Sequence, residues 1–592
     1  MFLALLAVLL TAKAFALAGR HLPVTAWAAI AFFWHDGAVA LAFACAEAAM
    51  RFCRTTPAAT ANQPPAATRR TVYGLYAAAA AYVVVNVPVT RVLATPMTGP
   101  MWRAARGPLA DSMRRHATLD MLLACGVTTA VALAAPFAAR RLHRPARRLI
   151  LAILVLASAL GPLATSRLDT GGFERNAWTA LIEPVLPSAA AAPSNAYWTR
   201  RGFDRSREDD LTSLAGAAAG RHIIFVSLES AGAQYLGLYG AQPDVMPSLS
   251  RLAQHAIVFE RAYAAYPESI KGLYSILCSA WPAAGSDVSS YGGRRCPSLA
   301  ERLAQRGYRT ALFHSGRFGY LGMEAVVRGR GYETLADAGD IGGHRQSSFG
   351  VDEASTVAAM LRWIDSLPAG SRFFLTYLPI AGHHPYETPE PGPYEGVDDR
   401  SRYLNALRYA DQSLELLMRG LDARGLTRNL LWIVAGDHGE AFGQHVGNYG
   451  HTFYIYEENV HVPLVIAAPG LIPAETRRKQ VVSLIDIAPT VLDLAVRGET
   501  PAAGDRFAPA LEGQTMSDGR SRMAFFAADY SRRMIGLRDG RFKAILTLDS
   551  GRMMLFDLDA DPGEQTDIAA DHAGRAVWYE HNLRNWAAAH QR

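Results

Sequence analysis

The stretch NLLWIVAGDHGE, residues 429–440, joins an apolar run to a turn that is rich in acids and imidazoles. Residues 430–435 are all apolar, which is typical of a short strand buried on both faces of a sheet. Gly436 ends the run, and Asp437, His438 and Glu440 follow at once. A polar turn would account for this pattern. A metal site would account for it as well, because carboxylates and imidazoles are ligands for zinc and manganese.

Other segments after residue 221 also read as a buried strand followed by a polar turn. They are HIIFVSLES (222–230), YRTALFHSG (308–316) and RFFLTYLPIAGHHP (372–385), and segments with helical spacing such as MPSLSRLAQHA (246–256) lie between them. Strands that alternate with helices predict a mostly parallel sheet covered on both faces. Ligands bind beyond the carboxyl ends of such strands. We therefore expect the residues at four strand ends to share one edge of the sheet: Glu229, His314, His383 and the pair Asp437–His438.

A hydroxyl nucleophile is predicted in AYPESIKGLYS, residues 265–275. Ser269 stands where a strand-like segment passes into a helix, and a helix N-terminus stabilises an anion. An N-cap role would suit the same position. Beside a metal ion the hydroxyl would be activated for attack. Lys271 would add positive charge there, and His314 and His383 are predicted to hold substrate phosphate oxygens.

The apolar residues of the chain concentrate in its first 170 positions. Half of the 592 residues are hydrophobic, and five stretches are long enough to be predicted as membrane spans, at about 1–18, 23–48, 73–95, 117–139 and 149–166. A cleaved signal peptide at the start is disfavoured because a charged n-region is missing. His35 and Asp36, inside the second span, are expected to face other helices.

The loops between the predicted spans set the expected orientation. The Arg-rich segments 51–70 and 140–148 would share one side, which the positive-inside rule makes cytoplasmic. The loop 96–116 also holds four Arg and is interpreted as an interfacial helix. Five spans then predict a transmembrane domain over 1–168, a linker over 169–220 and an extracytoplasmic catalytic domain over 221–592.

Two classes of partner or site are excluded by composition. The net charge of +6 is modest, and the polar half has no Lys/Arg-rich run with interleaved aromatics, so nucleic acid is not expected as a partner. None of the five cysteines forms a C-x-x-C pair, which argues against a thiolate zinc site.

Five motifs between about 220 and 570 resemble the sulfatase-type branch of the alkaline phosphatase superfamily. They occur in the family's order: VSLESAGAQYLGLYG…MPSLSRLA, AGDHGE, YEENVHVPLVIAAPG, SLIDIAPTVLDLA and LFDLDADPGEQTDIA. With membrane spans before them, they resemble the lipoteichoic acid synthases and phosphoethanolamine transferases of bacterial envelopes. The resemblance implies a five-helix transmembrane bundle followed by an α/β alkaline-phosphatase-like domain with a mostly parallel central sheet.

The resemblance also implies a role for each matching residue. Glu229, Asp437 and His438 match metal ligands, and Ser269 falls where the transferases have a metal-bound Thr nucleophile. His314 and His383 match residues that hold the substrate phosphate. The cofactor implied is one divalent ion, zinc or manganese, and a second ion is an alternative. His451 resembles a further active-site histidine for substrate or for that second ion, and Glu440 is interpreted as a supporting residue.

This sequence also departs from its apparent relatives. Sulfatases carry C/S-x-P-x-R, but Ile270, Lys271 and Gly272 follow Ser269, so neither Pro nor Arg is present. RFGYLGM (317–323) replaces the Trp and Arg that follow FHG in the synthases. The ethanolamine enzymes have several disulfides, whereas here only Cys278 and Cys296 lie in the polar half, where an oxidising compartment would allow them to pair.

Together these features predict a metal-dependent phosphotransferase of the bacterial inner membrane. It would move phosphoethanolamine or phosphoglycerol from a phospholipid donor to an envelope glycan or glycolipid through a phospho-Ser intermediate. The enzymatic alternative is a membrane-bound hydrolase of phosphoric or sulfuric esters. A third possibility is a degenerate domain that binds lipid and regulates, which retention of the predicted metal ligands disfavours.

Overall fold

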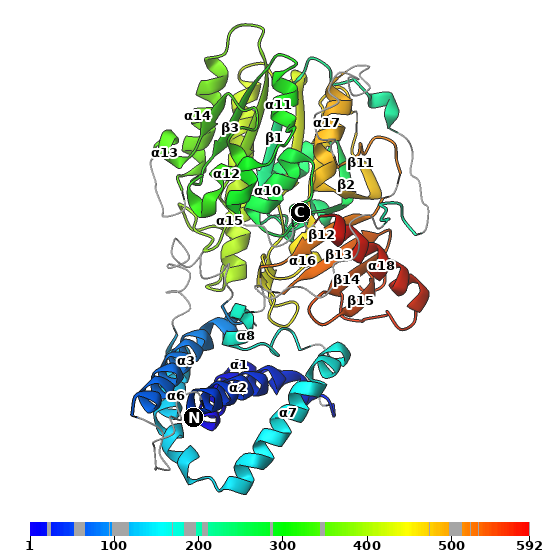
Figure 1. Cartoon of the computed structure of the whole chain (residues 1–592). Helices are drawn as coiled ribbons and strands as arrows, with labels where there is room; N and C mark the ends of the chain where they lie inside the picture. The colour runs from blue at the N-terminus through cyan, green and yellow to red at the C-terminus, as the bar shows by residue number, and fades with distance from the viewer. Residues whose placement is uncertain are drawn as a thin grey trace. The chain divides into compact units, whose positions relative to one another are not determined.

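The computed structural model describes residues 1–20, 25–52, 66–93, 95–97, 118–168, 170–182, 197–203, 211–283, 288–343, 350–472, 474–496, 512–520, 522–530 and 532–590. The described chain divides into two compact units, one built mainly from residues 1–190 and the other mainly from residues 191–592 (Figure 1). The predicted interfacial helix at 96–116 lies almost entirely outside the described residues.

The first unit is helical, and four of its described helices are long and apolar enough to cross a membrane. They are α2 (Ala28–Phe52), α3 (Ala66–Leu93), α6 (Leu119–Arg141) and α7 (Arg144–Arg167). The prediction of five spans is wrong at the first one. Helix α1 (Phe2–Leu17) has 16 residues, which span roughly 24 Å at about 1.5 Å per residue, whereas a bilayer core is about 30 Å thick. The loss of the first span changes the expected side of the N-terminus and leaves α7 as the single crossing after the Arg-rich segment 140–148.

Polar groups inside the first unit pair with one another, as expected for His35 and Asp36. Lys13 Nζ lies 3.3 Å from Asp36 Oδ2 and also donates to the backbone carbonyls of residues 173–175. His35 Nδ1 lies 2.8 Å from the hydroxyl of Thr179, in the short helix α8 (Ala177–Ile182). These contacts join α1 and α2 to the segment that follows α7, so the buried charges have a structural use.

The second unit is built on a nine-stranded, mostly parallel sheet. Its order is β11-β2-β10-β6-β1-β5-β3-β4, and β9 pairs with β2. Strands β6, β1, β5, β3 and β4 run parallel, and β10 is antiparallel to both of its neighbours. The strands are β1 (His222–Leu228), β2 (Ala256–Tyr263), β3 (Tyr308–His314), β4 (Thr334–Ala336), β5 (Arg372–Leu378), β6 (Leu430–Gly436), β9 (His461–Val462), β10 (Leu464–Ala467) and β11 (Thr476–Ser483).

Helices cover both faces of this sheet, which explains why its central strands are mostly apolar (Figure 1). On β1, Ile224 and Val226 pack into one core with α9 (Pro247–Ala253), α14 (Glu353–Asp365) and α15 (Asp399–Asp422). The alternate residues Ile223 and Phe225 pack into a second core with α10 (Ser269–Cys278), α11 (Leu299–Ala304) and α17 (Ile487–Ala495). The predicted α/β domain is therefore confirmed.

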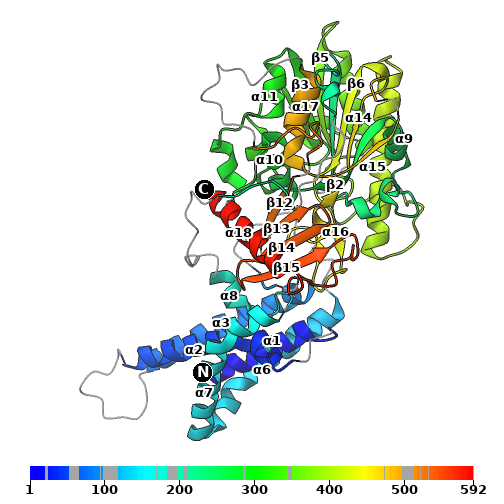
Figure 2. The same cartoon turned by 90° about the vertical axis from the view of Figure 1, so that its right-hand side faces the viewer.

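A smaller sheet completes the second unit. It has the order β12-β13-β14-β15, and helix α18 (Ala573–Ala589) contacts β13 and β14 (Figure 2). Its strands are β12 (Ala524–Ala528), β13 (Met534–Asp539), β14 (Phe542–Thr547) and β15 (Arg552–Asp557). Within the predicted linker, Arg200 forms a buried bidentate pair with Asp486, with both N–O distances at 2.7 Å. Residues 197–203 are therefore anchored on the second unit.

Candidate active site

The carboxyl ends of neighbouring strands bring the predicted site residues to one edge of the large sheet. Leu228 of β1 pairs with Gly436 of β6, so Glu229 and Asp437 follow adjacent strand positions. His314 of β3 pairs with Leu378 of β5, and His383 lies in the loop after β5. The parallel register thus brings together residues that are more than 200 positions apart in the sequence.

Glu229, Asp437 and His438 form a compact group of buried side chains. His438 Nε2 is 3.6 Å from Glu229 Oε1 and 3.6 Å from Asp437 Oδ2. One potential ligand atom from each of the three residues lies within 4.8 Å of the others. Two carboxylate oxygens and one imidazole nitrogen are a donor set that suits zinc or manganese.

Ser269 places its hydroxyl inside this group. Its Oγ lies 3.0 Å from Glu229 Oε1 and 3.1 Å from His438 Nε2. Ser269 is the first residue of α10, and the N-cap is Glu268, whose side chain accepts from the Lys271 N–H. The N-cap role that Ser269 might have had is thus filled by its neighbour, which leaves the Ser269 side chain directed at the ligand set.

The buried carboxylates of Glu229 and Asp437 favour a bound cation. Burial, and then the neighbouring Asp437, raises the pKa of Glu229. Burial likewise raises the pKa of Asp437 to about 7 and lowers that of His438 to about 4. Two adjacent buried carboxylates are costly to ionise without a positive charge between them, and a divalent ion supplies that charge. The residues present therefore fit a divalent metal.

Ser230 supports the group through an unusual backbone conformation, which the sequence did not signal. Its φ is +56°, a left-handed value that is rare outside glycine. In this conformation its N–H donates to Asp437 Oδ1 at 2.9 Å, and its hydroxyl donates to Glu229 Oε1 at 3.0 Å. Strained residues of this kind cost about 1–3 kcal/mol and cluster at functional sites.

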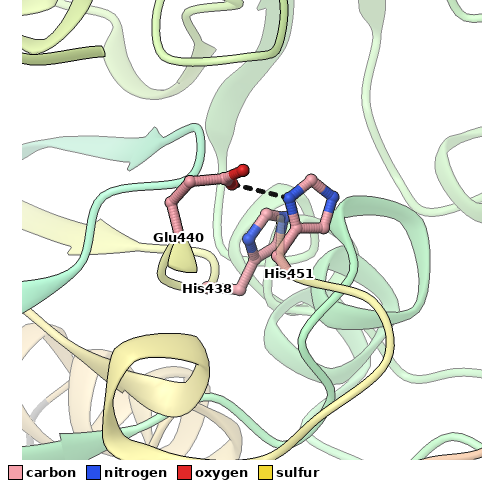
Figure 3. Close-up of side chains that lie close together, drawn as sticks. All are labelled: His438, Glu440 and His451. Atoms are coloured by element: carbon pink, nitrogen blue, oxygen red, sulfur yellow. Dashed lines mark hydrogen bonds and ion pairs between the residues drawn. The ribbon is translucent and has the colours of Figure 1, made fainter. Parts of the chain in front are cut away.

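A second group of polar side chains adjoins the first. His451 Nδ1 lies 2.7 Å from Glu440 Oε2, and the His451 ring is 4.0 Å from the ring of His438, measured between centroids (Figure 3). The hydroxyl of Tyr386 donates to Glu440 Oε1 at 2.7 Å. His438, Glu440 and His451 each offer an atom within 4.8 Å of the others, so they form a second candidate metal group. Glu440 thus contacts His451 rather than Ser269.

Three histidines of the site share one hydrogen-bonding pattern. Nδ1 of His314 lies 2.9 Å from the Leu378 carbonyl, that of His383 lies 2.6 Å from the His384 carbonyl, and that of His438 lies 3.0 Å from the Gly439 carbonyl. A carbonyl can only accept, so Nδ1 carries a proton in all three rings. Burial lowers the pKa of His314 to about 4.

The remaining predicted residue, Lys271, has its ammonium group occupied by neighbours. Its Nζ lies 3.0 Å from Asp529 Oδ1 and 3.3 Å from the hydroxyl of Tyr266. Asp529 follows β12 of the smaller sheet, 258 positions away in the sequence. The pair therefore joins the helix that carries Ser269 to the smaller sheet.

Two family models match this chain between residues 221 and 586. Residues 221–497 match the family model described as Sulfatase, and residues 445–586 match the model described as N-sulphoglucosamine sulphohydrolase, C-terminal. A solved structure from Vibrio parahaemolyticus, described as a protein in the alkaline phosphatase superfamily, superposes with a TM-score of 0.50 at 19% identity. It covers 68% of this chain and 92% of that chain, and at this identity it shows the fold alone.

Two curated relatives carry different printed names. The chain is 22% identical over 391 residues to lipoteichoic acid synthase-like YvgJ of Bacillus subtilis, a match that covers 61% of this chain and 63% of that protein. It is 31% identical over 182 residues to arylsulfatase K of Bos taurus, a match that covers 29% of this chain and 33% of that protein. The chain thus spans less than two thirds of the length of either relative.

Proposed function

We propose that this chain, which carries a sulfatase-type domain of the alkaline phosphatase superfamily, is a metal-dependent phosphotransferase of the bacterial inner membrane. It would transfer a phospholipid head group, phosphoethanolamine or phosphoglycerol, to an envelope glycan or glycolipid. Similarity to a lipoteichoic acid synthase-like protein supports a lipid-linked substrate. The four apolar helices support a membrane anchor.

One observation carries the proposal. The Ser269 hydroxyl lies 3.0 Å from Glu229 Oε1 and 3.1 Å from His438 Nε2, at the centre of a ligand set. Glu229, Asp437 and His438 would hold the divalent ion, which when bound lowers the pKa of a hydroxyl beside it and neutralises charge on a phosphoryl group. A serine at this position serves as a nucleophile without chemical modification.

The chain's own residues then account for two displacement steps. Ser269 Oγ attacks the phosphorus of the donor, the bond from phosphorus to the diacylglycerol oxygen breaks, and diacylglycerol leaves with a proton. An acceptor hydroxyl next attacks the phospho-Ser, which restores the Ser269 hydroxyl and releases the product. His314 and His383 would hold phosphoryl oxygens from the side of β3 and β5 as protonated rings, in which Nε2 donates as well as Nδ1.

The location outside the cytoplasm is part of the proposal. Cys278 and Cys296 are joined by a disulfide bond, and such bonds persist in oxidising compartments and are rare in the cytosol. The Arg-rich segment 140–148, which includes the end of α6 and the start of α7, would then lie on the cytoplasmic side.

The test uses the purified full chain in detergent with labelled phosphatidylethanolamine or phosphatidylglycerol. Ser269→Ala should abolish both diacylglycerol release and labelling of the protein while the metal content stays unchanged. Ser275→Ala, on the same helix, is the matched control and should behave like the parent. Diacylglycerol release that persists in Ser269→Ala would end the proposal.

The alternative, a hydrolase of phosphoric or sulfuric esters, is favoured by the similarity to arylsulfatase K. The residues after Ser269 weigh against the sulfatase route, because Lys271 and Leu273 stand where that motif has Pro and Arg. Free head group with no acceptor product in the same assay, or release of sulfate from an aryl sulfate, would establish the alternative. Failure of the chain to bind zinc or manganese would instead indicate a non-enzymatic role.

A further inference from the structure

Glu353 is a buried carboxylate outside the ligand set. It is the first residue of α14 and is 1% exposed. Within the part of the chain that the structure describes, its hydrogen-bond partners are neutral and no Lys, Arg or His pairs with it. The N-terminus of α14 offers a partial positive charge, yet a buried carboxylate without a cationic partner still carries a large desolvation cost. Its presence therefore needs a reason.

The carboxylate joins two loops. Its Oε1 accepts from the Ser315 hydroxyl at 2.8 Å and from the Ala381 N–H at 3.0 Å, and its Oε2 accepts from the Tyr377 hydroxyl at 2.5 Å. The Ser315 hydroxyl oxygen in turn accepts from the Ile380 N–H at 2.7 Å. One side chain thus links the end of β3 to the end of β5.

These two loops carry the two histidines expected to hold phosphoryl oxygens. Ser315 directly follows His314, and Ala381 lies two residues before His383. The loop after β5 is also packed closely on the first metal ligand. Gly382 has φ +109°, and a Cβ there would lie 2.3 Å from the Glu229 carbonyl oxygen. A small movement of this loop would therefore alter its contact with Glu229.

We propose that Glu353 is a positioning residue that holds the loops of His314 and His383 at the spacing needed to grip a phosphoryl group. This rests on the proposed function, because it assigns both histidines to phosphoryl oxygens. Glu353 touches neither the substrate nor the metal ligands and acts through Ser315 and Ala381. A carboxylate suits this task because it offers two oxygens that accept from both loops and from Tyr377 at once.

Met in place of Glu353 breaks the arrangement with little change in volume, because its side chain has no oxygen that accepts from either loop. Gln is a weaker test: with its oxygen toward Ser315 and Ala381 it keeps both loop bonds, and its NH₂ group can donate to the Tyr377 hydroxyl, which can donate in turn to Ser413 Oγ at 3.1 Å. A residue that merely filled space would tolerate the exchange to Met without any effect on ligand affinity.

The experiment measures binding of inorganic phosphate by calorimetry to the full chain in detergent, loaded with manganese or zinc. We expect Glu353→Met to weaken phosphate binding about tenfold, which is about 1.4 kcal/mol, with the metal content equal to that of the parent. Asp411→Asn is the matched control, since Asp411 is a fully buried carboxylate that caps α9 through the N–H groups of Ser248 and Leu249. It should leave phosphate affinity within twofold of the parent.

Ser315→Ala removes the hydroxyl that bonds to Glu353 and to the Ile380 N–H, and it keeps the test decisive if Glu353→Met fails to fold. It should also weaken phosphate binding, and the double variant should lose less than the sum of the two single losses, because both act through one link. Phosphate affinity within twofold of the parent in a folded, metal-loaded Glu353→Met or Ser315→Ala would overturn the proposal. An equal loss in Asp411→Asn would do the same. Because no transfer is measured, absence of transferase activity would leave this result standing.

Discussion

Asp529→Asn tests whether Lys271 acts on the substrate or on the fold. The sequence predicts a substrate contact for Lys271, two residues after Ser269. In the structure its Nζ lies 3.0 Å from Asp529 Oδ1 and 4.5 Å from the centroid of the Tyr266 ring. The side chains of Lys271 and Asp529 are 7% and 10% exposed, so solvent screens the pair only weakly. Neutralising Asp529 leaves an ammonium group buried without its counter-charge.

The size of the effect follows from this burial. Removal of one partner of a buried ion pair costs about 3–5 kcal/mol. A domain of roughly 370 residues has an unfolding entropy near 0.8 kcal/mol per kelvin at about 2.1 cal/mol/K per residue, so the apparent Tm should fall by about 5 °C. Lys271→Met should also destabilise the fold, because it removes the cation that lies 3.0 Å from Asp529 Oδ1. In the double variant neither charge is present, and most of the loss should be recovered.

The assay is thermal unfolding of the full chain in detergent for the parent, both single variants and the double variant. Arg328→Gln, which removes an exposed pair with Glu324, serves as control and should not change the Tm measurably. Phosphate affinity of the metal-loaded double variant should stay within twofold of the parent. A double variant no more stable than the singles would refute the ion-pair argument. A stable double variant that no longer binds phosphate would instead assign Lys271 to the substrate.

Three further outcomes are expected. Cys278→Ala/Cys296→Ala should lower the unfolding free energy by about 3 kcal/mol for a sequence separation of 18 residues, and a reductant should destabilise the parent but not this variant in thermal unfolding. Burial raises the pKa of Glu353 from 4.5 to about 7. Ionisation of Glu353 therefore destabilises the folded state, and this destabilisation is absent below pH 4.5 and complete above pH 7. The Tm of Glu353→Gln should therefore rise relative to the parent between pH 5 and pH 8, and a difference that is independent of pH would contradict this. Asp437→Asn should lose the bound divalent ion in elemental analysis, whereas Glu440→Gln should keep an ion at the Ser269 site; retention of the full metal content by Asp437→Asn would contradict the ligand assignment.

The sequence predicted the large sheet because its signals are local. Apolar runs such as 430–435 identify strands buried on both faces, and a polar residue after each run marks its carboxyl end. Parallel pairing then brings these ends together without any further information, as the register of β1 with β6 illustrates. The family motifs added roles for the residues at these ends, among them Glu229 and Asp437 as metal ligands.

Other features depend on pairs of residues that no local pattern connects. In the sequence Lys271 resembles a free cation beside a nucleophile, because its partner Asp529 lies 258 positions away. Glu353 reads as an ordinary acid in the first turn of a helix, because its partners come from β3 and β5. The first helix fails as a predicted span for a simpler reason: the apolar stretch is real, but its helix ends at Leu17, too short for the hydrocarbon core.

The environment of α10 supports the proposal that Ser269 works without modification. In the sulfatase pattern, a Pro and an Arg follow the modified residue at the second and fourth positions. Here Lys271 at the second position is paired with the smaller sheet, and Leu273 at the fourth is 3% exposed in an apolar core. Gly272 lets the helix approach closely, since a Cβ there would lie 3.2 Å from the Tyr266 carbonyl oxygen and 3.5 Å from that of Asp437. The helix can thus bring a plain hydroxyl within 3.1 Å of His438 Nε2, which is the arrangement that a serine nucleophile for phosphoryl transfer requires.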